Sequence, residues 1–221
     1  DAPDDFRPRV PRALMSLLET AACHASAQRW GVMYEVLVRV HHGERTLVDD
    51  AADATICTLR RMAHAVEREC HKMHAFVRFR SAPLEAGGER YVAWFEPEHD
   101  ILARVAPFFI DRFAAMDWTI VTPRGAIHWD RRSLRHIARA DAPTLPQSDE
   151  NESLWRAYYA AIFNPARLNG RMMRKELPVR YWRNLPEAHD IANLERSARL
   201  RVAGMLAAPA AAPLRARRDE I

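Results

Sequence analysis

The chain has 221 residues, of which 48% are hydrophobic and 28% are charged, and its 33 basic and 29 acidic side chains give a formal net charge of +4. This composition is typical of a globular protein and excludes a mainly disordered, collagen-like or coiled-coil chain. No apolar stretch approaches the roughly 20 residues that span a bilayer, and three cysteines are too few for a disulfide framework. We therefore expect a soluble, cytoplasmic protein with reduced thiols and no membrane contact. Because the chain opens at Asp1 rather than at a methionine, we also expect it to be a segment of a longer protein.

The first part of the chain is expected to be helical. Pro11 suits a first helical position, and apolar residues follow it at helical spacing up to Ala21. The apolar segment from Trp30 to Val40 is rich in β-branched residues and fits a helix or a strand, but its length favours a helix. Asp53 is a good N-cap, and apolar residues recur every three or four positions from there to Met73, which predicts a long helix.

The apolar period then changes from helical to alternating. Residues 76–80 and 91–95, separated by a Gly-Gly turn, predict a first hairpin. Residues 118–121 and 126–130, joined by a Pro-Arg-Gly turn, predict a second hairpin, and a short strand is expected at 134–137. The helix expected between the hairpins, over 101–116, contains Pro107, which either kinks the helix or marks its start.

The C-terminal part alternates between polar and helical segments. Residues 140–150 have the composition of a linker, and helices are expected at 154–162 and 191–206. The Ala/Pro/Arg-rich residues 207–221 are typical of a tether.

These elements predict an α+β fold, in which a small antiparallel sheet of about four or five strands is covered by helices from both ends of the chain. We expect a single domain over 1–206, because a chain of this length can bury a sufficient core. Its parts are the helical residues 10–74, the sheet-rich residues 75–138, the linker and the helical residues 151–206.

Positive charge is arranged in blocks. Five basic residues stand against one acidic residue in 124–139, six against three in 51–80, and thirteen against seven in 151–221. A surface that faces phosphates requires such clustering.

Two clusters could carry other chemistry. Cys70 and His74 share a helix face and could ligate a metal with His71 nearby and His99 or His128 to close the set, but the spacing matches no zinc signature, so we predict no metal and no cofactor. In the sequence from Glu96 to Asp100, His99 is flanked by carboxylates at the start of a helix. This pattern fits a helix cap better than a general base, although His99 is still the best catalytic candidate.

The segment from Phe163 to Glu187 is rich in arginine with Tyr181 and Trp182 interleaved. Arginines and aromatic side chains can bind phosphates and stack on bases, but Tyr181 and Trp182 could equally be anchors in a core. The candidate nucleic-acid-binding residues are Arg78, Arg80, Arg124, Arg131, Arg132, Arg167, Arg171, Arg174, Lys175, Arg180, Tyr181, Trp182 and Arg183.

Several motifs resemble those of a bacterial family. They are the segment from Arg68 to Phe79, the segment from Glu96 to Leu102, Pro107-Phe108-Phe109 with Arg112-Phe113 and Trp118, the segment from Leu154 to Arg156, the segment from Phe163 to Leu168, and Pro178 followed by the segment from Tyr181 to Glu187. The family is described only as probable DNA metabolism proteins, and the resemblance covers most of residues 10–206. Its members occur alone, beside a radical S-adenosylmethionine (SAM) protein, or fused ahead of a uracil-DNA glycosylase superfamily domain of the UdgX type. The segments from Phe163 to Leu168 and from Tyr181 to Glu187 are most similar to the fused form.

The resemblance implies a DNA-repair setting. Together with the basic blocks, it favours a non-catalytic DNA-binding or adaptor domain that serves uracil recognition or excision, with uracil-containing or single-stranded DNA and a fused or associated glycosylase-like domain as partners. One alternative is an enzyme that acts on a nucleic acid or nucleotide, with His99 as acid and base. In this hypothesis, Glu98 or Asp100 would orient His99, and Arg112 or Arg78 would hold an anion. Another is a docking module for a radical SAM protein, in which exposed aromatic residues would dominate the contact surface.

Overall fold

The computed structural model describes residues 10–83 and 89–139, and beyond these only 157, 178–185, 190, 193, 196–197 and 200. The chain divides into two compact units, Asp1–Asp149 and Glu150–Ile221. The single domain expected over 1–206 stays a prediction. The linker expected at 140–150 and the tether at 207–221 lie outside the described residues, as do most positions of the helices expected at 154–162 and 191–206.

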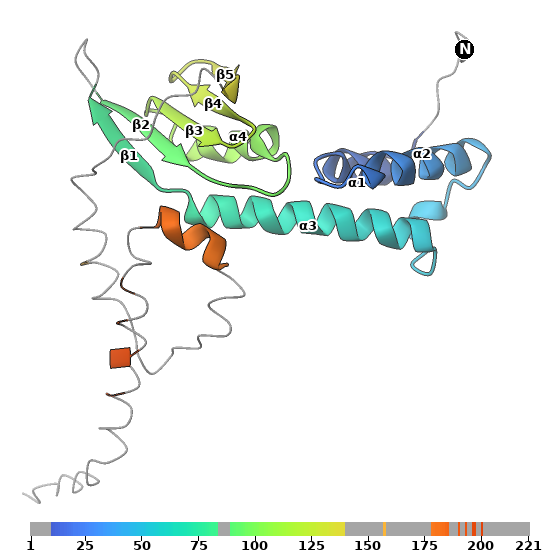
Figure 1. Ribbon diagram of the computed structural model, residues 1–221. Helices are drawn as coiled ribbons and strands as arrows, with labels where there is room; N and C mark the ends of the chain where they lie inside the picture. Colours follow the sequence, from blue (N-terminus) through green and yellow to red (C-terminus); the bar gives the residue numbers. More distant parts are fainter. Residues whose placement is uncertain are drawn as a thin grey trace, which may run out of the picture. The chain divides into compact units, whose positions relative to one another are not determined.

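Three helices form the N-terminal part of the first unit: α1 (Arg12–Ala22), α2 (Gln28–His41) and the long α3 (Ala54–Phe76). α1 and α2 pack along the N-terminal part of α3, and the one-turn helix η1 (Leu47–Asp49) links α2 to α3 (Figure 1). Leu14, Val36 and Leu59 are fully buried between the helices. The sequence therefore predicted all three helices correctly, including the helical state of α2.

The start of α3 confirms the predicted N-cap. Oδ1 of Asp53 accepts hydrogen bonds from the backbone N–H groups of Thr55 and Ile56 at 3.0 and 2.9 Å. Its Oδ2 lies 2.7 Å from Nη1 of Arg39. These hydrogen bonds, from Ile56 above all and from Arg39, lower the pKa of Asp53. The cap thus also ties α2 to α3.

A five-stranded sheet forms the rest of the first unit, in the order β1-β2-β3-β4-β5. The strands are β1 (Phe79–Pro83), β2 (Glu89–Trp94), β3 (Trp118–Thr122), β4 (Gly125–Trp129) and β5 (Leu134–Ile137). Both predicted hairpins and the short fifth strand are present. The first strand begins at Phe79 rather than at Phe76, because α3 continues to Phe76.

The α+β class is confirmed, but the expected antiparallel sheet is mixed. β2 and β3 pair in parallel, with Tyr91 opposite Trp118 and Trp94 opposite Val121, whereas the other three pairings are antiparallel. A parallel pair requires a crossover connection, and α4 (Leu102–Arg112) supplies it. α4 runs through Pro107, which neither starts nor ends the helix.

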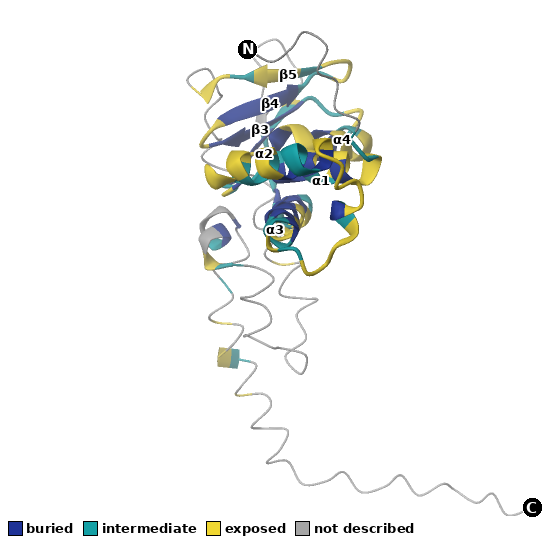
Figure 2. Ribbon diagram, turned by 90° about the vertical axis from the view of Figure 1, so that its right-hand side faces the viewer, coloured by how far each residue is buried: buried dark blue, intermediate teal, exposed yellow. Residues whose placement is uncertain are grey.

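α4 covers one face of the sheet. The aromatic ring of Phe79 lies 6.1 Å from that of Phe109, 5.3 Å from that of Phe113 and 6.0 Å from that of Trp118, measured between centroids. Side chains alternate between faces along a strand, so the neighbours of these residues on each strand point to the opposite face. In Figure 2, β3 and β4 are buried and the edge strand β5 is largely exposed.

The second unit is described mainly at the short helix η4 (Val179–Asn184). Within it, Tyr181 is buried, as is Leu185 just after its end. No helix among the described residues has the length and apolar character needed to cross a membrane.

Candidate nucleic-acid interface

The face of the sheet opposite α4 carries a row of polar and basic residues. In the register of the sheet, Arg80 on β1 is followed across the strands by Val92, Thr119, His128 and Arg135. Arg90 precedes Val92 by two positions and so lies on the same face. The sheet thus gathers residues from all five strands, up to 55 positions apart in the chain.

A cavity of about 470 Å³ opens on this face. This volume lies within the range of roughly 300–1,000 Å³ that small-ligand sites occupy. Basic and polar side chains form one part of its wall and short apolar residues another. The cavity is lined by Arg90, Thr119, His128, Arg135, His136, Ile137 and Ala138.

Both arginines of the cavity are held by a carboxylate through one nitrogen. Nε of Arg90 lies 3.3 Å from Oδ1 of Asp117, and Nη2 of Arg135 lies 3.5 Å from Oδ2 of Asp130. In the described part of the chain, the two Nη groups of Arg90 have no hydrogen-bond partner. Each guanidinium therefore retains N–H donors for an anion.

Asp130 is itself fixed by the turn between β4 and β5. It accepts hydrogen bonds from the backbone N–H groups of Arg132 and Ser133 and from the hydroxyl of Ser133. The hydrogen bonds from Ser133 and Arg132 lower the pKa of Asp130 to about 2. Asp130 is therefore ionised at neutral pH, and Arg135 stands beside a fixed negative charge.

The ring of His128 is oriented by the neighbouring strand. Its Nδ1 lies 3.2 Å from the carbonyl oxygen of Trp118 and 3.0 Å from Oγ1 of Thr119. In the tautomer with the proton on Nδ1, the ring donates to this carbonyl oxygen, which can only accept. Nε2 has no hydrogen-bond partner among the described residues and is not enclosed by protein, so it is open towards the cavity that His128 lines.

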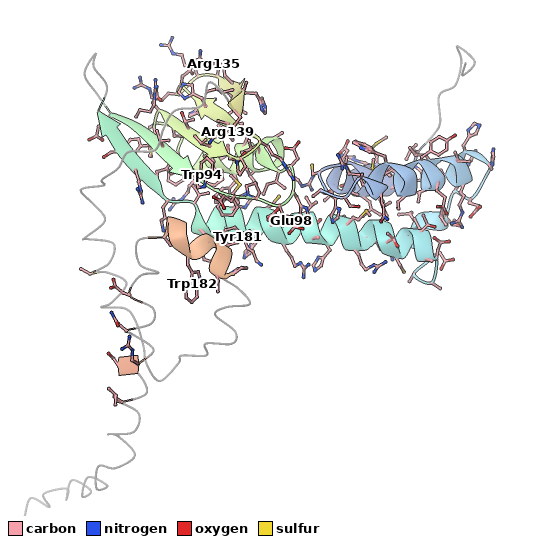
Figure 3. All side chains as sticks on the ribbon, viewed as in Figure 1. Trp94, Glu98, Arg135, Arg139, Tyr181 and Trp182 are labelled. Carbon is pink, nitrogen blue, oxygen red and sulfur yellow. The ribbon has the colours of Figure 1, made fainter. Side chains whose placement is uncertain are left out.

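The other end of the same face is apolar. Trp94 and Ile137 pack against the buried Val92, Val121 and Ala126. The guanidinium carbon of Arg139 lies 5.1 Å from the centre of the Trp94 ring, which is a cation–π contact (Figure 3). Nε1 of Trp94 donates to Oε1 of Glu96 at 2.8 Å. An indole and two further arginines, Arg80 and Arg139, thus extend the basic surface beyond the cavity.

Comparison with known proteins gives a family match over most of the chain. A family described as a domain of unknown function, DUF4130, matches residues 27–187. The chain belongs to the DUF4130 family. No curated protein and no solved structure matches it. The match confirms the predicted family, since DUF4130 is the domain family found in DNA metabolism proteins. The link to UdgX-type glycosylases stays a prediction.

Of the five predicted arginines of this DUF4130 domain whose side chains the structure describes, only Arg80 lies on the open face of the sheet at an assigned strand position. Arg78 donates to the carbonyl oxygens of Ala75 and Val77 and so caps the end of α3. Arg124, in the β3–β4 turn, donates to the carbonyl oxygen of Glu98 at 2.6 Å. Arg131 and Arg132 are exposed in the β4–β5 turn, where Arg131 has a left-handed φ of 73°.

The predicted residues of the C-terminal block are described only in part. Arg167, Arg171, Arg174 and Lys175 lie outside the described residues, and the side chains of Arg180 and Arg183 are not described either. Tyr181 is 1% exposed, whereas Trp182 is intermediate. The burial of Tyr181 favours an anchor over a base-stacking residue.

His99 is a buried residue of the fold, with 5% of its surface exposed. Its Nδ1 accepts a hydrogen bond from the backbone N–H of Ala25 at 3.2 Å, and its ring lies 4.5 Å from that of His24. Burial is the largest cause that lowers its pKa, against the carboxylate of Glu69. No carboxylate of the described residues is hydrogen-bonded to its ring.

Glu98 and Arg112, two other candidate catalytic residues, make their described hydrogen bonds and ring contacts with residues other than His99. Glu98 is exposed, and its backbone N–H donates to Glu69. Arg112 is the last residue of α4, and its guanidinium carbon lies 5.9 Å from the centre of the Phe113 ring. Since α4 begins just after His99, Arg112 is displaced from it by about 15 Å of helix at 1.5 Å per residue. This arrangement does not support acid–base catalysis at His99.

The Cys-His cluster at the end of α3 has an apolar environment. Cys70 is buried, which raises the pKa of its thiol to about 11. His74 stacks on Phe108 at 4.0 Å between ring centroids, and burial lowers its pKa. The part of the chain that the structure describes contains no group of three or more potential metal ligands.

Sequence reasoning missed Arg90, Thr119, Arg135 and Arg139 as site residues, and considered His128 only as a metal ligand. Arg135 and Arg139 belong to the basic block 124–139, which was the available signal. Arg90 carried no comparable signal, because only the parallel pairing of β2 with β3 brings it to the same face as Arg135.

Proposed function

We propose that this DUF4130 domain is a non-catalytic DNA-binding domain that acts as an adaptor in uracil-DNA repair. The observation that supports binding is the arginine-lined cavity on the open face of the sheet, in which Arg90 has both Nη groups without a hydrogen-bond partner among the described residues. Guanidinium groups bind phosphate oxygens through paired N–H donors, and such contacts position a protein on DNA.

The charge balance of this face supports the same conclusion. This face carries four arginines, Arg80, Arg90, Arg135 and Arg139, and three carboxylates: Asp117 paired with Arg90, Asp130 paired with Arg135, and Glu96 hydrogen-bonded to Trp94. Such a surface neutralises phosphates and releases their counterions. Trp94 and Arg139 add a flat cationic and aromatic surface of the kind on which unpaired bases stack, which favours single-stranded DNA.

The adaptor part of the proposal rests on the finer family resemblance. That resemblance implies a fusion ahead of a UdgX-type uracil-DNA glycosylase domain, which would supply the hydrolase chemistry. The domain described here would then hold DNA for the fused or associated catalytic domain. Consistent with a role in binding, His99 is engaged by the backbone N–H of Ala25 rather than by a carboxylate.

Fluorescence anisotropy with labelled single-stranded and duplex DNA tests binding. The variant R90A/R135A removes two cavity arginines, and R45A/R61A is its control because it changes the net charge equally in the α1–α3 part of the unit. If each cavity arginine makes one phosphate contact, the slope of log K against log salt falls in magnitude by about 1.4 for a single strand and about 1.8 for a duplex. The control should keep most of the parental slope.

Two results would refute the proposal. The first is the absence of DNA binding by the parent chain at low salt. The second is an equal loss of affinity in R90A/R135A and R45A/R61A, because binding would then depend on net charge alone. The non-catalytic part has its own test: a uracil-containing strand incubated with the chain and treated with alkali should stay intact.

A further inference from the structure

The cavity on the open face of the sheet has more space than a phosphate contact needs. Its volume is about 470 Å³. At roughly 30 Å³ for each water molecule in the liquid, this space corresponds to about 15 waters, and a phosphate ion alone would leave most of it to solvent. The cavity therefore has room for a ligand with both a charged group and an organic body.

The wall of the cavity changes in chemistry from one part to another. Arg90 and Arg135 provide cationic donors, and Ile137 and Ala138 provide apolar surface. Between these parts, His128 offers Nε2. In the tautomer whose Nδ1 donates to the carbonyl oxygen of Trp118, the lone pair at Nε2 can accept a hydrogen bond from a ligand.

These three features match the three parts of a nucleotide. Arg90 and Arg135 suit a phosphate, the apolar wall suits the flat face of a base, and Nε2 of His128 suits an N–H donor on the edge of a base such as thymine. Proteins that recognise a single base take it out of the stack and bind its edge and its face in a pocket. We propose that this cavity binds one unstacked nucleotide, a nucleoside monophosphate unit whose base offers a ring N–H.

This inference rests on the proposed DNA-binding function and adds the ligand of the cavity to it. A backbone contact alone would involve the two arginines and would be indifferent to the base. The binding of a nucleotide also involves His128 and the apolar wall. The two possibilities therefore differ in their response to ligands that lack one part of the nucleotide.

The test is calorimetric titration of the whole chain with thymidine 5′-monophosphate, with thymidine and with inorganic phosphate. We expect the monophosphate to bind at least about tenfold more tightly than either part, because each well-formed hydrogen bond to a charged group contributes about that factor. The N3-methyl analogue, which lacks the ring N–H, should bind about fivefold to tenfold more weakly.

Three variants assign the effect to the cavity. Arg135→Ala removes an exposed side chain whose loss should not disturb folding, and it should weaken binding of the monophosphate about tenfold. His128→Asn keeps a donor near the position of Nδ1 but removes Nε2, and it should abolish the difference between thymidine monophosphate and its N3-methyl analogue. Arg45→Ala should change neither the affinity for the monophosphate nor its difference from the N3-methyl analogue. Thermal melting of each variant checks that it is folded.

Three other results would also decide whether the cavity binds a nucleotide. Binding of the monophosphate no tighter than that of phosphate would overturn the inference and leave DNA binding in place. Loss of DNA binding in R90A/R135A without any binding of the monophosphate would also overturn it, since the cavity would then contact only the backbone. Binding of the monophosphate by a chain that does not bind DNA would support the inference and refute the proposed function.

Discussion

The buried carboxylate of Glu69 should be one of the main stabilising groups of the first unit. It lies near the C-terminal end of α3 and is 4% exposed. Its Oε1 accepts from the backbone N–H of Glu98 at 2.9 Å and its Oε2 from that of His99 at 2.7 Å. The same loop is held by the N–H of Asp100, which donates to the carbonyl oxygen of Cys23 at 2.9 Å. Glu69 therefore fastens the loop that leads into α4.

Glu69→Ala leaves two backbone N–H groups near the protein interior without their acceptor. Each unsatisfied group costs about 1–3 kcal/mol, and water that enters the space left by the side chain offsets part of this. We expect the free energy of unfolding to fall by about 3 kcal/mol, or the melting temperature by about 6–12 °C at 2–4 °C per kcal/mol. Glu69→Gln keeps one carbonyl acceptor and should lose about half as much.

Urea denaturation followed by tryptophan fluorescence measures these changes, and an unchanged m-value shows that the same surface unfolds. Glu67→Ala is the matched control, because Glu67 lies two positions earlier on α3 with its side chain 58% exposed and should change stability by less than about 0.5 kcal/mol. If the free energies of unfolding of Glu69→Ala and Glu67→Ala differed by less than about 1 kcal/mol, the two hydrogen bonds of Glu69 would not contribute the stability assigned to them.

Two further predictions concern a histidine and an aromatic pair. Burial lowers the pKa of His99. As the pH falls below about 6.5, the unfolded chain binds a proton at this histidine more readily than the folded chain does. The stability that His99 contributes is therefore complete above this pH and is lost below it. Between pH 7.5 and 5.5, the melting temperature of His99→Asn should therefore fall less than that of the parent. An equal fall in both proteins would contradict the lowered pKa of His99. Tyr181→Ala should cost about 3–5 kcal/mol of stability, as for other buried aromatic residues, and Trp182→Ala clearly less. Equal melting temperatures for these two variants would show that Tyr181 is not an anchor.

The elements that the sequence predicted well are those with a strong local signal. α3 has an N-cap at Asp53 and a helical apolar period as far as Met73, and both features depend only on neighbouring residues. The hairpin of β3 and β4 likewise follows from alternation around a short turn. Local patterns of this kind are physical constraints on the backbone and need no knowledge of the rest of the fold.

The candidate site depended on information that local patterns lack. Two antiparallel hairpins can join in either direction, and the crossover through α4 makes β2 and β3 parallel. That choice decides whether Arg90 lies near Arg135, and nothing in the residues around either arginine indicates it. His99 is the converse case, because a histidine between carboxylates has the same local pattern whether it is catalytic or, as here, buried against Ala25.

The crossover also determines when the cavity can form during folding. Arg90 lies on β2, and His128 and Arg135 lie on β4 and β5, so β3 must insert between them before the wall is complete. This insertion requires a parallel pairing across a long connection, a type of contact that forms slowly because the entropy of closing the chain is lost first. A fragment that ends before Trp118 would contain Arg90 but no cavity. A ligand of the cavity would bind only the completed sheet and would therefore raise the melting temperature, because at a free concentration L it stabilises the folded state by RT ln(1 + L/Kd). A nucleotide-dependent shift in melting temperature would thus report that the sheet around the cavity is complete.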